Sequence, residues 1–586
     1  MHSLNSTLNT RVTTVFVCLL LMTACSVFTA PSEFADNKVI KTSLDPLVAN
    51  TGQPFSEVAR KTDVIAYEID LELFPGSKSI SGFGSATFTM LEPSSQLELK
   101  LDPRYLISRV EVDGEPASYV AKNGSILIKL KDEASPKQRV KASVFYSGQP
   151  HIALNAPWDG GFVWDKTPSG EDWIATAVQG EGCDVFWPCK DHFADKADST
   201  SIKLTVPSNL TAVTNGKLQK TIALANNRTR FEWLLSVPAS DYNIALNVGP
   251  YGYIKRDYKS SNGQTVPIEF WPLKENQKKA ESLVEDDLVQ QLAFFEKHLG
   301  PYPWGTEKLG FVETPHLGME HQTVNAYGRN YKRDKHGFDW LLHHELAHEW
   351  FGNLMTHERL NDAWLHEGFG WYMQPAYSLY KDGEAAYQHR MYESYLRLKN
   401  CKAIVLDGDI SSDDAFNSDI YGKGGWVLHT LRWLIGDELF WQASRELVYG
   451  QADKVNTLLS PITPRYRNTQ DFIDIVNKMT NEDYSWLFDV YMKQASLPEL
   501  IVHRDESHLA LSWKTPNQLP FPMPVPVSID GDTLIVKIDP QAQNTSLPVS
   551  TSSHVIIDPQ MSVLRKLPII PTCEERIAEE ATQSPH

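Results

Sequence analysis

The feature that most constrains the fold of this chain is a change of hydrophobic period along its length. Between about residues 60 and 250, apolar and polar residues alternate, as in Ile65–Leu73, and this pattern indicates strands with one face in a core. From about residue 276 the apolar residues recur every three to four positions, as in Glu281–Leu299, which indicates amphipathic helices. Alternation returns in Leu509–Trp513 and Thr533–Ile538. The sequence therefore predicts a multidomain α+β fold.

We expect an N-terminal β domain over residues 56–254, a mixed α/β domain over 255–496 and a small C-terminal β-sandwich over 497–568. Residues 26–55 are expected to form a linker, and 569–586 a charged tail. Within the middle domain, the helical period predicts helices at 339–355, 366–381, 384–400 and 424–449.

The amino end carries an apolar run over residues 12–24, which is shorter than the roughly 20 residues of a membrane-spanning helix and is typical of an export signal. The run ends in Met22–Cys25, which resembles a bacterial lipoprotein signal box. That resemblance implies a protein exported to the periplasm or outer membrane, with lipid on Cys25 as its link to the membrane. The alternative is an ordinary signal peptide with an incidental cysteine.

Charge and cysteine content restrict the partners. The formal net charge is −18, and so acidic a surface repels the phosphate backbone, which argues against nucleic acid as a partner. Beyond the signal segment only Cys183, Cys189, Cys401 and Cys573 remain, too few for a disulfide scaffold. Cys183 and Cys189 are either a local disulfide or two buried thiols, and the sequence does not decide between them.

A candidate metal site lies in the middle segment. His344 and His348 are four residues apart in a helical pattern, so both imidazoles lie on one helix face and can bind one cation. Glu345 lies about 100° around the helix, beside the metal, where a carboxylate can accept a proton from an activated water. By itself this pattern is only suggestive, because such spacings also arise by chance.

Glu367 strengthens the interpretation, because it follows His348 after an 18-residue gap and supplies a third ligand. Two histidines and one carboxylate, with a fourth position open to water, are the donor set of catalytic zinc. Iron and manganese also use such ligands, but hydrolytic chemistry favours one zinc ion per chain. The alternative is two ordinary helix-surface histidines and a solvated carboxylate.

The segments around these ligands resemble the M1 family of zinc metallopeptidases. His344–Asn353 reads HELAHEWFGN and Trp364–Phe369 reads WLHEGF, both close to family signatures, and the resemblance extends from about residue 60 to 565. It implies a thermolysin-like catalytic domain of the gluzincin type, in a bacterial exported form without the long helical C-terminal domain. Without that domain, we expect a more open cleft unless a dimer covers it.

The resemblance also implies roles for individual residues outside the metal motif. Leu317–His321 resembles the exopeptidase loop, in which Gly318 and Met319 precede Glu320, the acid that captures the free α-amine of the substrate. Asp419–Gly425 resembles the segment of the catalytic tyrosine, so Tyr421 is the candidate donor to the oxyanion. Gln179 and Glu181 resemble the N-terminal segment that adds a second amine-binding acid.

The chain departs from the family pattern at three positions near the site. Leu317 stands where glycine is common, and His321 and His366 stand where asparagine is frequent. These differences affect the first side-chain pocket and, because an imidazole can titrate near neutrality, the pH profile. The proposed ligands are unaffected.

Together these patterns predict a zinc aminopeptidase that removes single residues from peptides with a free amino terminus. Carboxylates such as Glu320 and Glu181 would bind the cationic end of the peptide and fix the first peptide bond at the metal. The alternatives are a thermolysin-like endopeptidase, which ignores the free amine, and a catalytically silent peptide-binding lipoprotein. Epoxide hydrolysis, known in one branch of the family, is a more distant alternative. The preferred first residue, the physiological peptides and the oligomeric state cannot be derived from the sequence.

Overall fold

The computed structural model describes residues 51–539, 544–568, 571, 573 and 575. The predicted export signal, Cys25, nearly all of the linker and most of the tail lie outside these residues. Within the described part of the chain, every helix is too short or too polar to cross a membrane.

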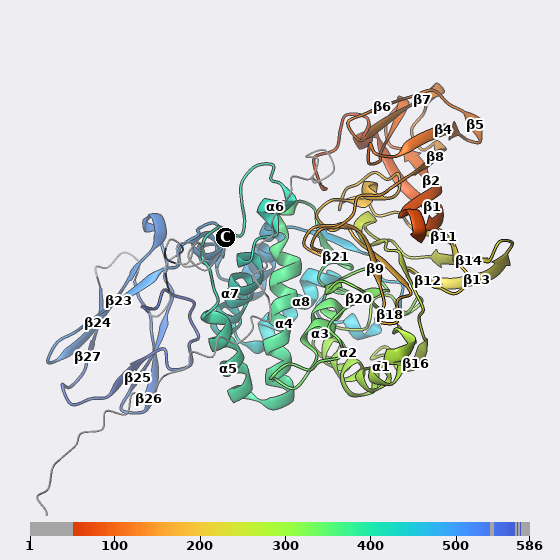
Figure 1. Ribbon diagram of the computed structural model, residues 1–586. Coiled ribbons are helices and arrows are strands. Elements are labelled where there is room, and N and C mark those ends of the chain that lie inside the picture. The colour runs from red at the N-terminus through yellow and green to blue at the C-terminus, as the bar shows by residue number, and fades with distance from the viewer. Residues whose placement is uncertain (1–50, 540–543, 569–570, 572, 574, 576–586) are drawn as a thin grey trace, which may run out of the picture. The chain divides into compact units, whose positions relative to one another are not determined.

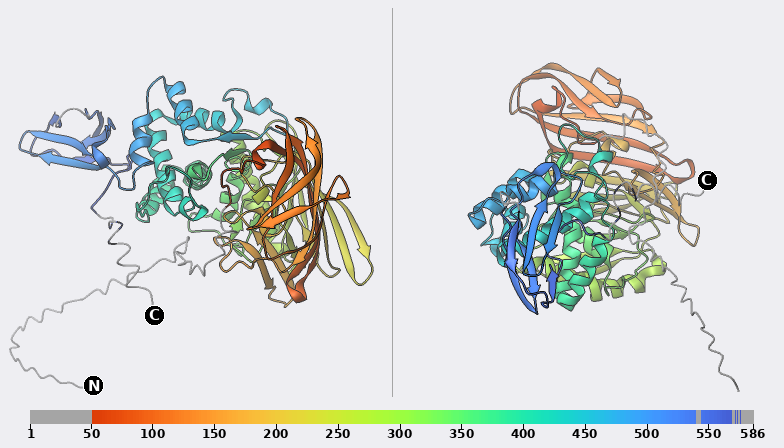
Figure 2. Two further views of the ribbon diagram at one scale, coloured as in Figure 1. Left: turned by 90° about the horizontal axis from the view of Figure 1, so that it is seen from above. Right: turned by 90° about the vertical axis from the view of Figure 1, so that its left-hand side faces the viewer.

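The N-terminal part is built of strands (Figure 1), and both views of Figure 2 show them gathered into one β-rich body. The large sheet runs in the order β13-β14-β11-β1-β2-β8-β4-β5. Its strands are β1 (Thr62–Phe74), β2 (Ser79–Met90), β4 (Leu106–Val112), β5 (Glu115–Pro116), β8 (Arg139–Gly148), β11 (Ser199–Pro207), β13 (Lys217–Leu224) and β14 (Arg228–Leu235). A second sheet contains β3 (Ser94–Lys100), β6 (Tyr119–Lys122) and β7 (Ser125–Ala134). A third contains β9 (Gly161–Lys166), β10 (Asp172–Ala177), β12 (Thr211–Val213) and β15 (Asn247–Gly249).

The alternation in the sequence explains the centre of the large sheet. Ile69, Leu71 and Leu73 of β1 are fully buried, whereas the polar residues between them are partly exposed. β1 pairs antiparallel with β2 and parallel with β11, in a register that sets Leu71 opposite Leu204. The predicted N-terminal β region is therefore confirmed.

The middle part combines a mixed sheet with helices. Its strands are β16 (Ile254–Lys259), β17 (Thr265–Trp271), β18 (Leu309–Glu313), β19 (Gly318–Met319) and β20 (Asn325–Tyr327), with β21 (Met355–His357) and β22 (Arg465–Arg467) paired separately. Its helices are α1 (Gln277–Leu283), α2 (Val289–His298), α3 (Trp340–Ala347), α4 (Trp364–Asp382), α5 (Glu384–Tyr395), α6 (Ser412–Ala415), α7 (Asp419–Ile435), α8 (Asp437–Tyr449), α9 (Thr469–Thr480) and α10 (Ser485–Tyr491).

Three predicted helices differ from those observed. The helix expected over 339–355 ends at Ala347 and is followed by a series of turns, and the helix expected over 384–400 ends at Tyr395. The helix expected over 424–449 is two helices, α7 and α8, separated at Gly436 with φ of 84°. Gly436 ends α7 inside an apolar helical pattern, because this backbone conformation favours glycine.

The C-terminal part consists of two small antiparallel sheets that share a core of their own. The strands are β23 (Glu499–Arg504), β24 (His508–Lys514), β25 (Val525–Ile529), β26 (Asp532–Val536), β27 (Thr545–Pro548) and β28 (Val555–Ile557). The shared core includes Leu509 and Leu511 from one sheet and Val525 and Val527 from the other. The predicted α+β class, with strands at both ends and helices between, is therefore confirmed.

Candidate active site

Three side chains from two helices meet in the middle part of the chain. His344 lies in α3, His348 directly follows it, and Glu367 lies in the first turn of α4. The Nε2 atoms of the two histidines are 3.1 Å apart, and Glu367 Oε2 lies 3.4 Å from each of them. Because all three side chains are buried, these donor atoms form a compact triangle inside the protein.

Local contacts fix the orientation of the triangle. Asp339 caps α3 by accepting hydrogen bonds from the backbone N–H groups of Leu341 and Leu342, both at 3.1 Å. His348 Nδ1 lies 2.9 Å from the carbonyl oxygen of Phe351. A carbonyl only accepts, so Nδ1 carries the proton and Nε2 keeps its lone pair for a metal.

The geometry fits zinc. Tetrahedral zinc with bonds of about 2.0–2.1 Å to nitrogen and oxygen holds neighbouring ligand atoms about 3.3 Å apart. The three observed separations, 3.1, 3.4 and 3.4 Å, match that spacing. Two imidazoles and one carboxylate also leave a fourth position open, as catalytic rather than structural zinc sites do.

Glu345 lies beside the triangle, against the Leu317–His321 loop that contains β19. A Cβ at Gly318 would stand 2.5 Å from Glu345 Oε1, so a larger residue there would displace the carboxylate or the loop. Burial raises the pKa of Glu345, and the Glu320 and Glu367 carboxylates add to the increase while His348 opposes it. A bound dication would act in the opposite direction, which would bring the pKa back toward the range useful for a general base.

Glu320 adds a second acid close to Glu345. Single donor atoms of Glu320, Glu345 and His348 all lie within 4.8 Å of one another. Gln179, from the segment after β10 in the N-terminal part, donates from Nε2 to Glu320 Oε1 at 2.5 Å and to Glu367 Oε1 at 3.5 Å. The site is thus built from both the N-terminal and the middle parts of the chain.

Tyr421 approaches the triangle from α7, and Figure 1 shows α7 beside α4. The two helices come into close contact at Gly424 and Gly368, where a Cβ on Gly424 would stand 3.2 Å from the Gly368 Cα. The Tyr421 ring centre lies 6.3 Å from that of His344. Burial raises the pKa of Tyr421, and the negative charge of Glu367 raises it further, so the phenol keeps the proton that it needs as a donor.

The two remaining predicted residues, Met319 and Glu181, are both buried. Met319 is buried and packs against Ala177 at the end of β10 and Ala326 in β20. Glu181 is also buried, and a Cβ at Gly160 would stand 1.9 Å from its Oε2. Of the predicted substrate-binding residues, Gln179 and Glu320 are in direct contact.

Two of the three departures from the family pattern, His321 and His366, do not act as the sequence suggested. Burial lowers the pKa of both His321 and His366 well below the usual histidine value. His366 Nε2 instead accepts a hydrogen bond from the backbone N–H of His357 at 3.0 Å. The expectation that an additional imidazole titrates near neutrality is therefore wrong for both residues, while Leu317 is only partly buried.

One contact at the site and two disulfides elsewhere were not predicted from the sequence. Tyr242 donates to Glu320 Oε1 at 3.1 Å, but it lies in a short turn between strands, where no periodic pattern indicates a role. Cys183 and Cys189 form a disulfide, which resolves the alternative left open by the sequence, and Cys401 pairs with Cys573. The second pairing joins positions 172 residues apart, and sequence reasoning offers no signal for such a distant pair.

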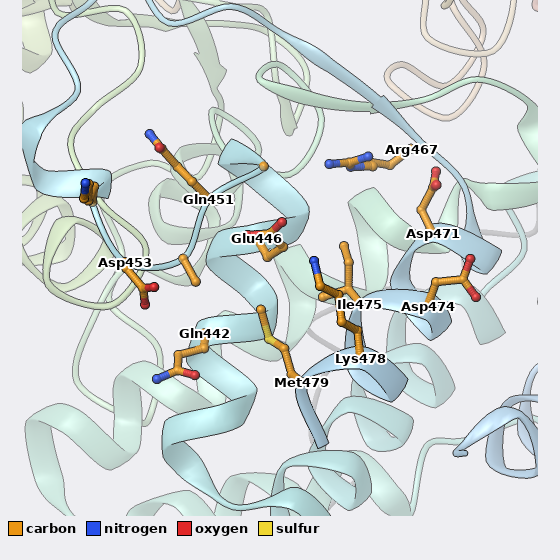
Figure 3. Close-up of a pocket in the computed structure, with 13 residues that line it drawn as sticks. Gln442, Glu446, Gln451, Asp453, Arg467, Asp471, Asp474, Ile475, Lys478 and Met479 are labelled. Carbon is orange, nitrogen blue, oxygen red and sulfur yellow. The ribbon is translucent and has the colours of Figure 1, made fainter. Parts of the chain in front are cut away.

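A separate depression of about 730 Å³ lies between α8 and α9 (Figure 3). It is lined by side chains of both charges, among them Glu446, Asp474 and Lys478. None of the predicted site residues lines it, so it is distinct from the metal site.

Comparison with known proteins agrees with the motifs. Residues 287–491 match the model of the peptidase family M1 domain. This segment is therefore similar to the catalytic domain of peptidase family M1. The chain is 28% identical over 301 residues to endoplasmic reticulum aminopeptidase 1 of Mus musculus, an alignment that covers 47% of the chain and 31% of that protein. It is 24% identical over 426 residues to aminopeptidase 2 of Candida albicans, an alignment that covers 67% of the chain and 43% of that protein.

A third relative, aminopeptidase B of Rattus norvegicus, is 23% identical over 399 residues, covering 62% of the chain and 58% of that protein. The chain thus spans less than two thirds of the length of these curated relatives. An M1 zinc metallopeptidase from Deinococcus radiodurans matches in structure with a TM-score of 0.63 and 23% identity, covering 75% of the chain and 94% of that protein. At this identity the likeness supports the fold.

Proposed function

We propose that the chain is a zinc aminopeptidase that hydrolyses the first peptide bond of peptides with a free amino terminus. The observation that carries the proposal is the position of Glu320, whose carboxylate lies within 4.8 Å of donor atoms of Glu345 and His348. A buried acid so close to a metal triad repels anions and attracts an ammonium group. Curated relatives named as aminopeptidases add support.

The side chains of Glu320, Glu181 and Gln179 position the substrate in this proposal. Glu320 accepts hydrogen bonds from the ammonium group of the peptide, and Gln179 holds the Glu320 carboxylate in place. Glu181 is the second acid that we assign to this socket. Fixing the amine at one end leaves only the first peptide bond within reach of the triad, which selects the removal of single residues.

The chemical step uses the zinc ligands, Glu345 and Tyr421. His344, His348 and Glu367 would hold the ion, which would supply polarisation of the scissile carbonyl and a lowered pKa of water. Glu345 takes the proton of the attacking water and delivers it to the leaving amine. Tyr421 donates a hydrogen bond to the oxygen of the scissile carbonyl as negative charge develops on it.

A panel of aminoacyl chromogenic amides tests the proposal, each with its amine free and N-acetylated, with and without a chelator. We expect turnover only of the free amines, loss of turnover with the chelator, and recovery when zinc is added. Turnover of the acetylated compounds would indicate an endopeptidase. Zinc binding without any turnover would indicate a peptide-binding protein instead.

We also propose that the chain acts outside the cytoplasm, anchored through lipid on Cys25. The sequence box at Met22–Cys25 supports this proposal. The disulfides Cys183–Cys189 and Cys401–Cys573 add support, because disulfides persist in oxidising compartments. Mass spectrometry of the mature amino terminus tests it: an acylated Cys25 is expected, and an unmodified terminus at another residue would contradict it.

A further inference from the structure

We infer that the short turn η4 (Asp241–Asn243) of the N-terminal part is the element that positions Glu320, with Tyr242 as the positioning residue for its carboxylate. The inference rests on the proposed function, since it concerns how the acid that captures the amine is held. Neither Tyr242 nor Asn243 belongs to a motif that the sequence indicates.

The contacts to Glu320 show how its carboxylate is oriented. Tyr242 donates from its hydroxyl to Glu320 Oε1 at 3.1 Å, and Gln179 Nε2 donates to the same oxygen at 2.5 Å. Two donors on Oε1 fix the plane of the carboxylate and leave the lone pairs of Oε2 for a cation. A substrate ammonium would then meet a carboxylate already set in one orientation, which reduces the entropy cost of binding.

The backbone of Glu320 is held by the same turn. Asn243 Nδ2 donates to the Glu320 carbonyl oxygen at 3.0 Å, and Asn353 Nδ2 donates to that oxygen at 3.2 Å. Consecutive residues of one turn therefore hold both the side chain and the main chain of Glu320. Asn353 lies in the turn that follows His348, so the position of Glu320 is also tied to the metal site.

Burial makes these contacts strong. Tyr242 is 3% exposed and Glu320 is also 3% exposed, so water does not compete for their hydrogen bond. Burial and the charge of Glu320 raise the pKa of Tyr242, and the phenol therefore stays protonated and able to donate. Loss of a hydrogen bond to a buried charged group typically reduces binding about tenfold to hundredfold.

Tyr242→Phe tests the inference, with Tyr146→Phe as the matched control. Tyr146 is a buried tyrosine of the same N-terminal part, and its hydroxyl donates at 2.5 Å to the carbonyl oxygen of Phe186, away from the triad. For the aminoacyl amide that the unmodified enzyme cuts best, we expect Tyr242→Phe to lower kcat/KM about tenfold to hundredfold. The control should stay within about twofold, and both variants should hold one zinc per chain.

A binding measurement separates positioning from a general structural effect. Each variant is combined with Glu345→Gln, and the Kd is measured by calorimetry for the same aminoacyl amide and for its N-acetyl derivative. We expect Tyr242→Phe to weaken binding of the free amine about tenfold or more and to leave binding of the acetylated compound unchanged. Equal losses for both compounds, or no loss for either, would overturn the inference.

The outcomes also separate this inference from the proposed function. If the unmodified enzyme cuts acetylated compounds as readily as free amines, the proposed function itself fails. If it requires a free amine but Tyr242→Phe matches Tyr146→Phe, only the role of Tyr242 fails. Should Tyr242→Phe not fold, Asn243→Ser, which removes the neighbouring contact to the Glu320 carbonyl, takes its place with the same expected and contrary results.

Discussion

Replacement of Gly318 by alanine tests where Glu345 must lie during catalysis. A Cβ at position 318 would stand 2.5 Å from Glu345 Oε1 and 2.7 Å from Leu341 Cδ1, whereas ordinary contact begins at 3.4 Å. The carboxylate must therefore retreat by about 0.9 Å, the difference between 3.4 and 2.5 Å, unless the loop moves instead. A misplacement of about 1 Å costs a reaction on the order of a hundredfold. We predict that Gly318→Ala lowers kcat about a hundredfold.

The assay is steady-state hydrolysis of the best aminoacyl amide, together with the zinc content of the purified variant. Zinc content should stay at one per chain, because the atoms nearest to a Cβ at position 318 belong to Glu345 and Leu341 rather than to the ligands. Gly305→Ala is the matched control, since its Cβ would find its nearest neighbour, Val266 Cγ2, at 3.4 Å. Full activity of Gly318→Ala would refute the reasoning, because Glu345 would then not be confined against this loop.

The remaining predictions concern the oxyanion donor, the helix cap and the general base. Tyr421→Phe should lower kcat about 10²–10³-fold with little change in KM, and stopped-time assays of the amide check it; an unchanged kcat would remove Tyr421 from the mechanism. Burial raises the pKa of Asp339 to about 6, above its value of about 3.9 in the unfolded chain, so the folded state binds more protons and loses stability as pH rises from about 4 to 6. Asp339→Asn lacks this titration, so its free energy of unfolding relative to that of the unmodified chain should increase by on the order of 3 kcal/mol between pH 4 and pH 7. Urea unfolding at both pH values measures this difference, and a difference that does not change with pH would contradict the prediction. Glu345→Gln should keep zinc and lose turnover, and retained turnover would exclude Glu345 as the base.

Local patterns in the sequence predicted the main strands and helices and the three side chains that meet in the triangle. Alternation along Ile65–Leu73 indicated the strand that became the centre of the large sheet, because the buried face of a strand must repeat every two residues. The spacing of His344 and His348 predicted that both imidazoles lie on one side of a helix, because residues four apart on a helix share a face; in the structure His348 directly follows α3. Glu367 was predicted as the third ligand from its spacing after His348 and from the resemblance of the flanking segments.

Contacts between distant segments could not be predicted from such patterns. Tyr242 donates a hydrogen bond to Glu320, which is 78 positions away in the sequence. No hydrophobic period or motif spacing predicts that contact. The division between α7 and α8 was also missed, because Gly436, which ends α7, lies inside an apolar run that continues the helical pattern. The low pKa values of His321 and His366 depend on burial, which is set by packing rather than by neighbours in sequence.

The most direct test of the account is a crystal structure of the zinc-loaded protein with a bound product amino acid, measured at the zinc absorption edge. The account predicts one anomalous peak about 2.0–2.1 Å from the Nε2 atoms of His344 and His348 and from a carboxylate oxygen of Glu367. The α-amine of the product should lie within hydrogen-bonding distance of Glu320. A zinc peak elsewhere, or an amine that points away from Glu320, would contradict the account.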